Sequence, residues 1–166
     1  MLTLGVETND FAAFVAYFRQ LASQHKRLAG SFVHGPSRRI VEGGRSKLSY
    51  PLLWLETPAL VLEEKDGTDP NGRRECALLI LINIPANQAD AAQDQAWAEA
   101  EQIMLQIVSR IRRDRKNRLF SSFRLTSAIE PVNTLTVNNE YGWRVEFEVS
   151  KPAGLCYDPT QWTSLT

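Results

Sequence analysis

The chain has 166 residues, the length of one folded domain, and its 19 basic and 19 acidic side chains cancel. A domain of this size buries roughly 70% of its unfolded surface, so it can form a core without disulfides or a structural metal. Zero net charge excludes a whole-chain attraction to nucleic acid or membranes and leaves only local clusters for electrostatic functions. We expect a single domain over residues 1–166.

The cysteines and the hydropathy of the chain indicate a cellular compartment. Cys76 and Cys156 lie far apart without a CxxC or Cys/His spacing, which favours a reducing compartment and no zinc site. The start, MLTLGVETNDF, lacks the features of a secretory signal, and the apolar run 77–82 is much shorter than the roughly 20 residues that cross a bilayer. We expect a soluble protein, cytoplasmic where it is synthesised, with no membrane partner.

The first predicted helix begins after Thr8, Asn9 and Asp10, whose side-chain oxygens can cap a helix. Apolar residues then recur at the three-and-four spacing of one helical face, and Gly30 is expected to end the helix. The apolar positions are Phe11, Phe14, Val15, Phe18, Leu21 and Ala22.

Residues 31–49 differ from this helix, because glycine and proline interrupt regular structure and positive charges gather. The basic side chains are Arg38, Arg39, Arg45 and Lys47. We predict a mobile basic loop over residues 31–49, with a short strand around Ile40 and Val41.

Three extended segments follow in the middle of the chain. YPLLWLETP (50–58) and ALVLEE (59–64) each predict a strand bounded by proline. KDGTDPNGRR (65–74) contains Asp-Gly, Asp-Pro and Asn-Gly pairs, which predict a turn. ECALLILINIP (75–85) is apolar on both faces, so we expect a strand inside a sheet, covered on each side or lying against a neighbouring subunit.

A second, longer helix is predicted from about Gln88 to Arg118, because apolar residues form one stripe along it. Acidic residues occupy its first half and basic residues its end, the order that the helix dipole favours. The basic residues at the end are Arg110, Arg112, Arg113, Arg115, Lys116 and Arg118.

The segment LTSAIEPVNTLTVNNEYGWRVEFEVS (125–150) predicts a hairpin with Leu135 and Val137 on one strand and a turn over 138–142. In the second strand Trp143, Val145, Phe147 and Val149 alternate with polar residues, so we expect these four side chains beneath the long helix. Residues 152–166 are expected to form a C-terminal tail. Together the elements predict an α+β domain, with two main helices packed on one face of a mostly antiparallel sheet of about five strands.

The sequence predicts no catalytic, cofactor-binding or metal-binding residues. GGRSK (43–47) lacks the GxxxxGK[ST] spacing of a nucleotide-binding loop, and no serine lies in a GxSxG turn. His25 and His34 have no partner at a ligand or catalytic spacing. Glu146 and Glu148 would lie roughly 7 Å apart on one strand face, but their alternation with apolar residues favours solvated charges.

Two basic clusters are candidate contacts to another subunit or to nucleic acid. They comprise Arg38, Arg39, Arg45, Lys47, Arg112, Arg113, Arg115 and Lys116. KNRLFSSFR (116–124) adds Phe120 and Phe123 as candidate stacking rings for nucleic-acid bases. A solvated helix end explains the second cluster equally well, and the neutral domain does not favour nucleic acid.

The order of elements resembles the tail-terminator, or tail-completion, proteins of tailed bacteriophages and prophages. The segments that carry the resemblance are YPLLWLETP, ALLILINIP, QADAAQDQAWAEAEQIM and YGWRVEFEVS, after an amphipathic helix and a basic irregular loop. Nearly the whole chain is covered, except for Asp66 to Arg74 and the tail from Pro152 to Thr166.

The resemblance implies a structural subunit without enzymatic activity that closes a ring, commonly sixfold, on the end of a tail tube. It also implies a homo-oligomer, contacts with other tail or neck proteins, and a place in the virion or in a tail-like particle. Two alternatives remain open: a nucleic-acid-binding accessory protein of a mobile element, and a small enzyme that would use Glu130, Glu146 or His34.

Overall fold

The computed structural model describes residues 11–36, 48–63, 71–85, 90–116, 122–133, 139–153 and 160. This part of the chain contains two helices and a seven-stranded sheet. The elements are α1 (Phe11–Gln24), β1 (Phe32–His34), β2 (Leu52–Leu55), β3 (Ala59–Glu63), β4 (Asn71–Asn83), α3 (Asp90–Lys116), β5 (Ser122–Leu125), β6 (Glu130–Asn133) and β7 (Glu140–Pro152). The α+β class predicted from the sequence is confirmed.

Two long strands, β4 and β7, form the centre of the sheet. Each has 13 residues, and they pair antiparallel over their whole length, from Asn71 opposite Pro152 to Asn83 opposite Glu140. Short strands continue the sheet on both sides: β2 and β3 pair with β4, β5 and β6 pair with β7, and β1 pairs parallel with β2.

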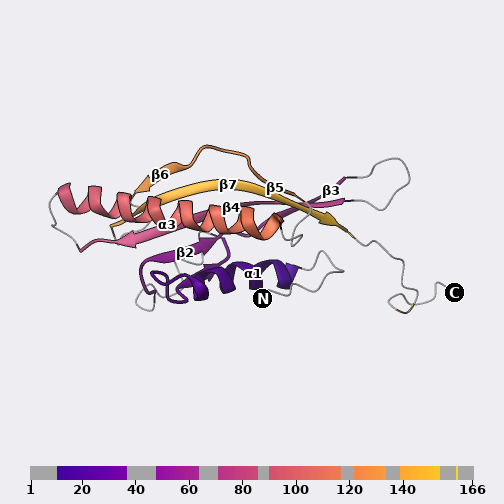
Figure 1. Cartoon of the computed structure of the whole chain (residues 1–166), viewed down its shortest axis with the longest axis horizontal. Helices are drawn as coiled ribbons and strands as arrows, with labels where there is room; N and C mark the ends of the chain where they lie inside the picture. The colour runs from indigo at the N-terminus through magenta and orange to yellow at the C-terminus, as the bar shows by residue number, and fades with distance from the viewer. Residues whose placement is uncertain are drawn as a thin grey trace.

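The short strands divide the sheet into two ends. At one end, which we call the β2/β6 end, β2 and β6 flank the central pair, and β1 lies outside β2. At the other, the β3/β5 end, the order is β3, β4, β7, β5. Figure 1 shows the long central strands extending from one end to the other.

One large hydrophobic cluster joins side chains of α1 and α3 to alternating positions of the sheet. From β7 it contains Val145, Phe147 and Val149, and Trp143 packs partly buried against it. Figure 1 shows α3 running along β4 and β7, and α1 lying near β2. We call the side of the sheet that this cluster occupies the core side, and the opposite one the outer side. Each fully buried large apolar side chain contributes roughly 1.5–3 kcal/mol.

The outer side is apolar only at the β2/β6 end. There Leu52, Trp54, Leu79 and Leu81 form a second, smaller buried cluster. The indole nitrogen of Trp54 donates a hydrogen bond to the carbonyl oxygen of Gly35 at 2.9 Å. The central strand β4 is therefore covered on both sides at this end, as its continuous apolar sequence predicts.

Short strands account for the difference from the predicted number of about five. β1 lies inside the segment predicted as a basic loop, and its three residues are held by β2 rather than by a local turn. β5 also lies outside the predicted strands, whereas β6 lies within the predicted hairpin segment 125–150 and pairs antiparallel with β7; each has four residues. The strand predicted around Ile40 and Val41 lies outside the described residues.

Two predicted turns are shorter than expected. Asn71 to Arg74 belong to β4, and Glu140 to Gly142 belong to β7. Gly142 allows a close approach of backbones: a Cβ atom there would lie 1.8 Å from the carbonyl oxygen of Ile80. The strand that pairs with this part of β7 is β6, whereas Leu135 and Val137 lie outside the described residues.

The first predicted helix is longer in the sequence pattern than in the structure. α1 ends at Gln24, and Gly30 adopts a φ of +90° beyond it, a conformation that favours glycine. Within the described segments, no helix is apolar over a long enough stretch to cross a membrane.

Candidate functional site

A network of ion pairs covers the outer side of the β3/β5 end. Arg73 of β4 lies at its centre, 2.9 Å from Glu63 of β3, 3.3 Å from Glu75 and 3.0 Å from Glu148 of β7. Arg124 of β5 reaches the other oxygen of Glu148 at 3.0 Å. Residues of four neighbouring strands are joined in this way, because the alternation along each strand places these side chains on the same side.

Glu148 is the buried member of this network, with 8% of its surface exposed. Its pKa is lowered mainly by the hydrogen bond from Arg124 and also by that from Arg73, although burial acts in the opposite direction. The pKa of Arg73 is raised, chiefly by its hydrogen bond to Glu148. The expectation of a solvated Glu148 is therefore wrong, because two arginines from neighbouring strands neutralise the carboxylate.

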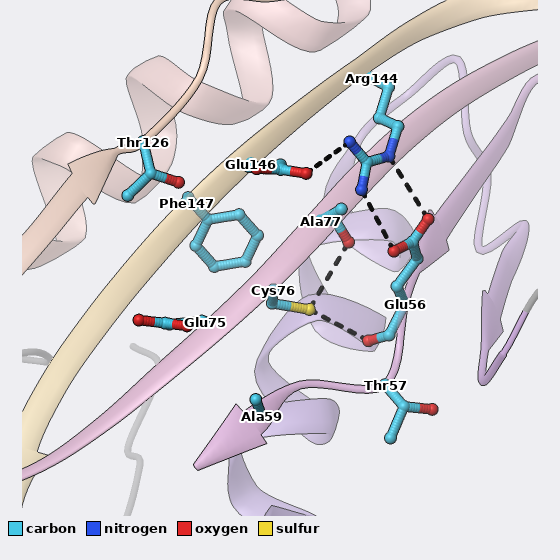
Figure 2. Close-up of a pocket in the computed structure, with 10 residues that line it drawn as sticks. All are labelled: Glu56, Thr57, Ala59, Glu75, Cys76, Ala77, Thr126, Arg144, Glu146 and Phe147. Carbon is cyan, nitrogen blue, oxygen red and sulfur yellow. Dashed lines mark hydrogen bonds and ion pairs between the residues drawn. The ribbon is translucent and has the colours of Figure 1, made fainter. Parts of the chain in front are cut away.

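A hollow of about 420 Å³, the sheet hollow, lies next to this network (Figure 2). Its place follows from the pairing of β4: β2 pairs with residues 78–81 and β3 with 71–75, so Cys76 and Ala77 lie between these two partners. The sheet hollow is lined by Glu56, Thr57, Ala59, Glu75, Cys76, Ala77, Thr126, Arg144, Glu146 and Phe147.

Arg144 is held between two carboxylates in the sheet hollow. Its guanidinium lies 2.8 Å from Glu146 and 3.4 Å from Glu56, and Figure 2 shows it between the two. Partial burial lowers the pKa of Arg144, but hydrogen bonds to Glu146 and Glu56 outweigh burial and raise it. The arginine is thus a fixed cation, paired with two carboxylates of the sheet hollow.

Cys76 is the one thiol among the described residues that line the sheet hollow. Its Sγ donates a hydrogen bond to the carbonyl oxygen of Glu56 at 3.0 Å (Figure 2). Burial, and next the nearby Glu56 carboxylate, raise the pKa of the Cys76 thiol to about 12. Because the thiolate is the reactive form, this thiol is a poor nucleophile at neutral pH.

The residues considered for a small enzyme lie on three strands. Glu146 lines the sheet hollow, whereas Glu130 is exposed on β6. His34 lies on β1, which β2 and β4 separate from β7, and its ring contacts Phe11 at 5.4 Å between centroids. In the described part of the chain, no group of three His, Cys, Asp or Glu side chains could hold a metal ion.

The second hollow lies between the end of α3 and β5 and has a volume of about 480 Å³. We call it the α3/β5 hollow; it is lined by Arg112, Arg115, Phe123, Arg124 and Leu125. Arg112 and Arg115 are exposed on α3, and the ion pairs between described residues do not include them. The hollow therefore combines apolar side chains from the sheet with cations from the helix.

Asp114 has the opposite orientation on the same helical turn. It is buried and accepts hydrogen bonds from Arg110 Nε at 2.9 and 3.0 Å and from Tyr17 Oη at 2.9 Å. Burial, and next the charge of Asp114, raise the pKa of Tyr17. This contact fixes the end of α3 to α1 and leaves the neighbouring arginines on the surface.

The structure brings together only part of the basic residues singled out in the sequence. Arg112, Arg113 and Arg115 lie exposed at the end of α3, and Lys116 is the last residue of that helix. Arg38, Arg39, Arg45 and Lys47 lie outside the described residues, and so does Phe120. The proposed stacking role of Phe123 is wrong, because this ring is 7% exposed and belongs to the main core cluster.

Two features of the β3/β5 end were not singled out in the sequence. Arg124 lines the α3/β5 hollow, and Leu60 and Leu62 are exposed on β3. The alternation in SFRL (122–125) was the available signal for Arg124, since it indicates a short strand with Phe123 and Arg124 on opposite sides.

No protein-family model matches this chain, and no curated protein matches it significantly.

Proposed function

We propose that this chain is a structural subunit of a phage or prophage tail, of the tail-terminator or tail-completion kind, and that it assembles as a ring. The resemblance in the order of elements suggests this role. In the proposed subunit both helices pack on one face of the sheet, and the edges of the sheet remain for contacts with other subunits.

The observation that carries the proposal is the exposed apolar edge at the β3/β5 end. In β3, Leu60 and Leu62 are 49% and 47% exposed, although β3 belongs to the same sheet as the buried core. Among the described residues β3 pairs with β4 alone, and large apolar side chains on such an edge strand are typical of a surface that another chain covers. The sheet hollow favours assembly over catalysis, because Arg144 and Glu75 already lie in ion pairs and the raised pKa of Cys76 keeps its thiol protonated.

Native mass spectrometry and light scattering over a range of concentrations test this function. We expect a concentration-dependent closed ring with one defined number of subunits, six being the number that the resemblance implies. Negative-stain electron microscopy should show an annulus, and purified tail tubes should bind it at one end. A protein that stays monomeric at all concentrations in buffers that keep tails intact would contradict the proposal.

A nucleic-acid-binding accessory protein is the second candidate, and the exposed arginines of α3 favour it. Each of Arg112, Arg113 and Arg115 can contact a phosphate, and each such contact lowers log K by about 0.9 per unit of log salt on duplex DNA. Fluorescence anisotropy with labelled DNA should then show a steep salt dependence that R112Q/R113Q/R115Q reduces. The matched control is K26Q on an exposed part of the chain near α1, and equal salt slopes for both variants would exclude this candidate.

A further inference from the structure

Four strands of the described sheet pair on one side only: β1, β3, β5 and β6. They differ in how well they could accept another strand. β6 contains Pro131, which has no N–H to donate, and β1 has only three residues, whose side chains are partly buried. β3 and β5 lie on opposite edges of the same end of the sheet, which makes them the two edges best suited to pairing.

The edge at β3 projects apolar side chains on the core side. Leu60 is paired with Arg74, and Leu62 with Gly72. Arg74 points to the core side, because its guanidinium lies over the rings of Phe11 and Phe14 of α1, at 5.7 and 5.6 Å. Paired residues share a side of the sheet, so both leucines also project to the core side.

The edge at β5 offers a matching recess on the same side. Phe123 is paired with Val149 of the core cluster, so Phe123 and Leu125 face the core side. Arg112 and Arg115 extend from α3 over them and complete the α3/β5 hollow. The aliphatic parts of these long side chains can cover apolar residues while the charged heads remain in water.

The outer sides of the two edges carry opposite charges. Glu63 of β3 lies on the outer side with Arg73 and is half exposed. Arg124 of β5 lies on the outer side with Glu148, and 69% of its side chain is exposed. The two edges are therefore complementary on both sides of the sheet: leucines match a recess on one side, and an acid matches a base on the other.

The directions of the strands are also compatible. β3, β4, β7 and β5 are antiparallel from each strand to the next, so β3 and β5 of one molecule run in opposite directions. A second copy placed in the same orientation therefore sets its β5 antiparallel to β3 of the first copy. Its core side stays on the same side of the extended sheet.

We propose that β3 of one copy pairs antiparallel with β5 of a second copy, so that Leu60 and Leu62 enter the α3/β5 hollow and Glu63 faces Arg124. The inference rests on the ring assembly proposed above and names the contact between its subunits. Every copy has both edges, so the contact is head-to-tail and repeats until the ring closes. The backbone hydrogen bonds of the added strand provide affinity, and the leucines provide register.

Disulfide cross-linking between the two edges tests the contact directly. The double variants L60C/L125C and L62C/L125C cover two registers, and C156S in all variants removes the thiol outside the described residues. Under mild oxidation we expect one of them to form a ladder of covalent dimers, trimers and higher species on a non-reducing gel. Dimers alone from the single variant L62C would instead indicate a symmetric contact between two β3 strands and would overturn the proposal.

Assembly measurements with charged substitutions complete the test. L60D/L62D should raise the concentration at which half of the protein is assembled by at least tenfold, with the circular dichroism spectrum unchanged. L105D is the matched control, because Leu105 is 50% exposed on α3 and lies in neither edge, and this variant should assemble like the unsubstituted protein.

The outcomes separate this contact from the proposed function. If the unsubstituted protein forms rings but neither cross-links nor responds to L60D/L62D, the contact is wrong and the ring function stands. If the cross-linked ladder forms but electron microscopy shows open filaments, the contact is right and the ring function fails. A protein that is monomeric throughout and forms no ladder would overturn both.

Discussion

At the β2/β6 end of the sheet, apolar side chains are buried on both sides of β4, whereas at the β3/β5 end only the core side is apolar. The first end has Leu79 and Leu81 on its outer side, and both are buried. The second end has the network around Arg73 in the corresponding place, and its edge strand exposes Leu60 and Leu62.

This difference indicates that one end of the sheet stabilises the chain and the other end is available for a contact with another chain. The β2/β6 end has little exposed apolar surface on its strands, so its side chains stabilise the single chain. The β3/β5 end keeps charges and two leucines at the surface, where they contribute little to the stability of a monomer but can contribute to a contact. Substitutions at the first end should therefore affect folding, and substitutions at the second end should mainly affect assembly.

The largest effect is expected at Gly142 in the β2/β6 end. G142A would place a Cβ atom 1.8 Å from the carbonyl oxygen of Ile80, a backbone atom that cannot move without disturbing the central pair. We expect a loss of about 3 kcal/mol or more in the free energy of unfolding, measured by urea denaturation.

G30A is the matched control for this prediction. Gly30 has a φ of +90°, but a methyl group added there would have no atom within 4 Å, so this variant should lose only about 1–2 kcal/mol through backbone strain. Equal losses for the two variants would show that the close approach at Gly142 does not matter.

A pair of leucine substitutions compares the two ends directly. L79A removes a buried side chain at the β2/β6 end and should lower the free energy of unfolding by about 2–4 kcal/mol. L60A removes a half-exposed side chain at the β3/β5 end and should change it by less than about 0.5 kcal/mol under conditions where the protein is monomeric. A large loss for L60A in the monomer would mean that β3 is part of the folding core, and the comparison would fail.

The sequence predicts the β2/β6 end better than the β3/β5 end, and the reason is physical. A strand that is buried on both sides, such as β4, has a continuous apolar run in its sequence. The amphipathic pattern of the second helix predicts bounds that lie within two residues of those of α3. Alternation along 143–149 likewise identifies the residues of β7 that join the core. These signals are local, because each comes from the period of one element.

The contacts of the β3/β5 end depend on residues far apart in the chain. Glu148 binds Arg73, 75 positions away, and Arg124, 24 positions away. Alternation shows that Glu148 faces away from the core, but it does not show which strand lies beside it. β1 and β5 were missed for the same reason, since strands of three or four residues are held by their partners rather than by their own sequence pattern.

An intermediate effect is expected for the ion-pair network, with a distinct pH dependence. Because the pKa of Glu148 is lowered in the folded state, its contribution to stability is fully present above the unfolded-state pKa and is lost as the pH falls through the folded-state pKa. E148Q should therefore lower the free energy of unfolding by about 1–3 kcal/mol at pH 7. The difference from the unsubstituted protein should shrink at acidic pH, below the ordinary glutamate pKa of about 4.3.

Urea denaturation at pH 7 and at pH 3 measures this difference, and E99Q on α3 provides a control from outside the network. A constant difference for E148Q at both pH values would show that the buried charge is not what stabilises the β3/β5 end.

A smaller loss than for E148Q is expected at the polar contact on the core side of the same end. Y17F removes the hydroxyl that donates to Asp114 at 2.9 Å, while Arg110 remains hydrogen-bonded to the carboxylate. The free energy of unfolding should fall by about 1 kcal/mol, the usual net value of one hydrogen bond, because the ring of the phenylalanine still fills the core. Thermal denaturation of Y17F beside that of S23A, an exposed position of α1 whose hydroxyl donates to the carbonyl oxygen of Gln20, measures this loss. If the hydrogen bond between Tyr17 and Asp114 fixes the end of α3 over β5, Y17F should also weaken assembly, whereas S23A should leave assembly unchanged. An assembly midpoint that Y17F does not change would show that this hydrogen bond contributes to folding alone.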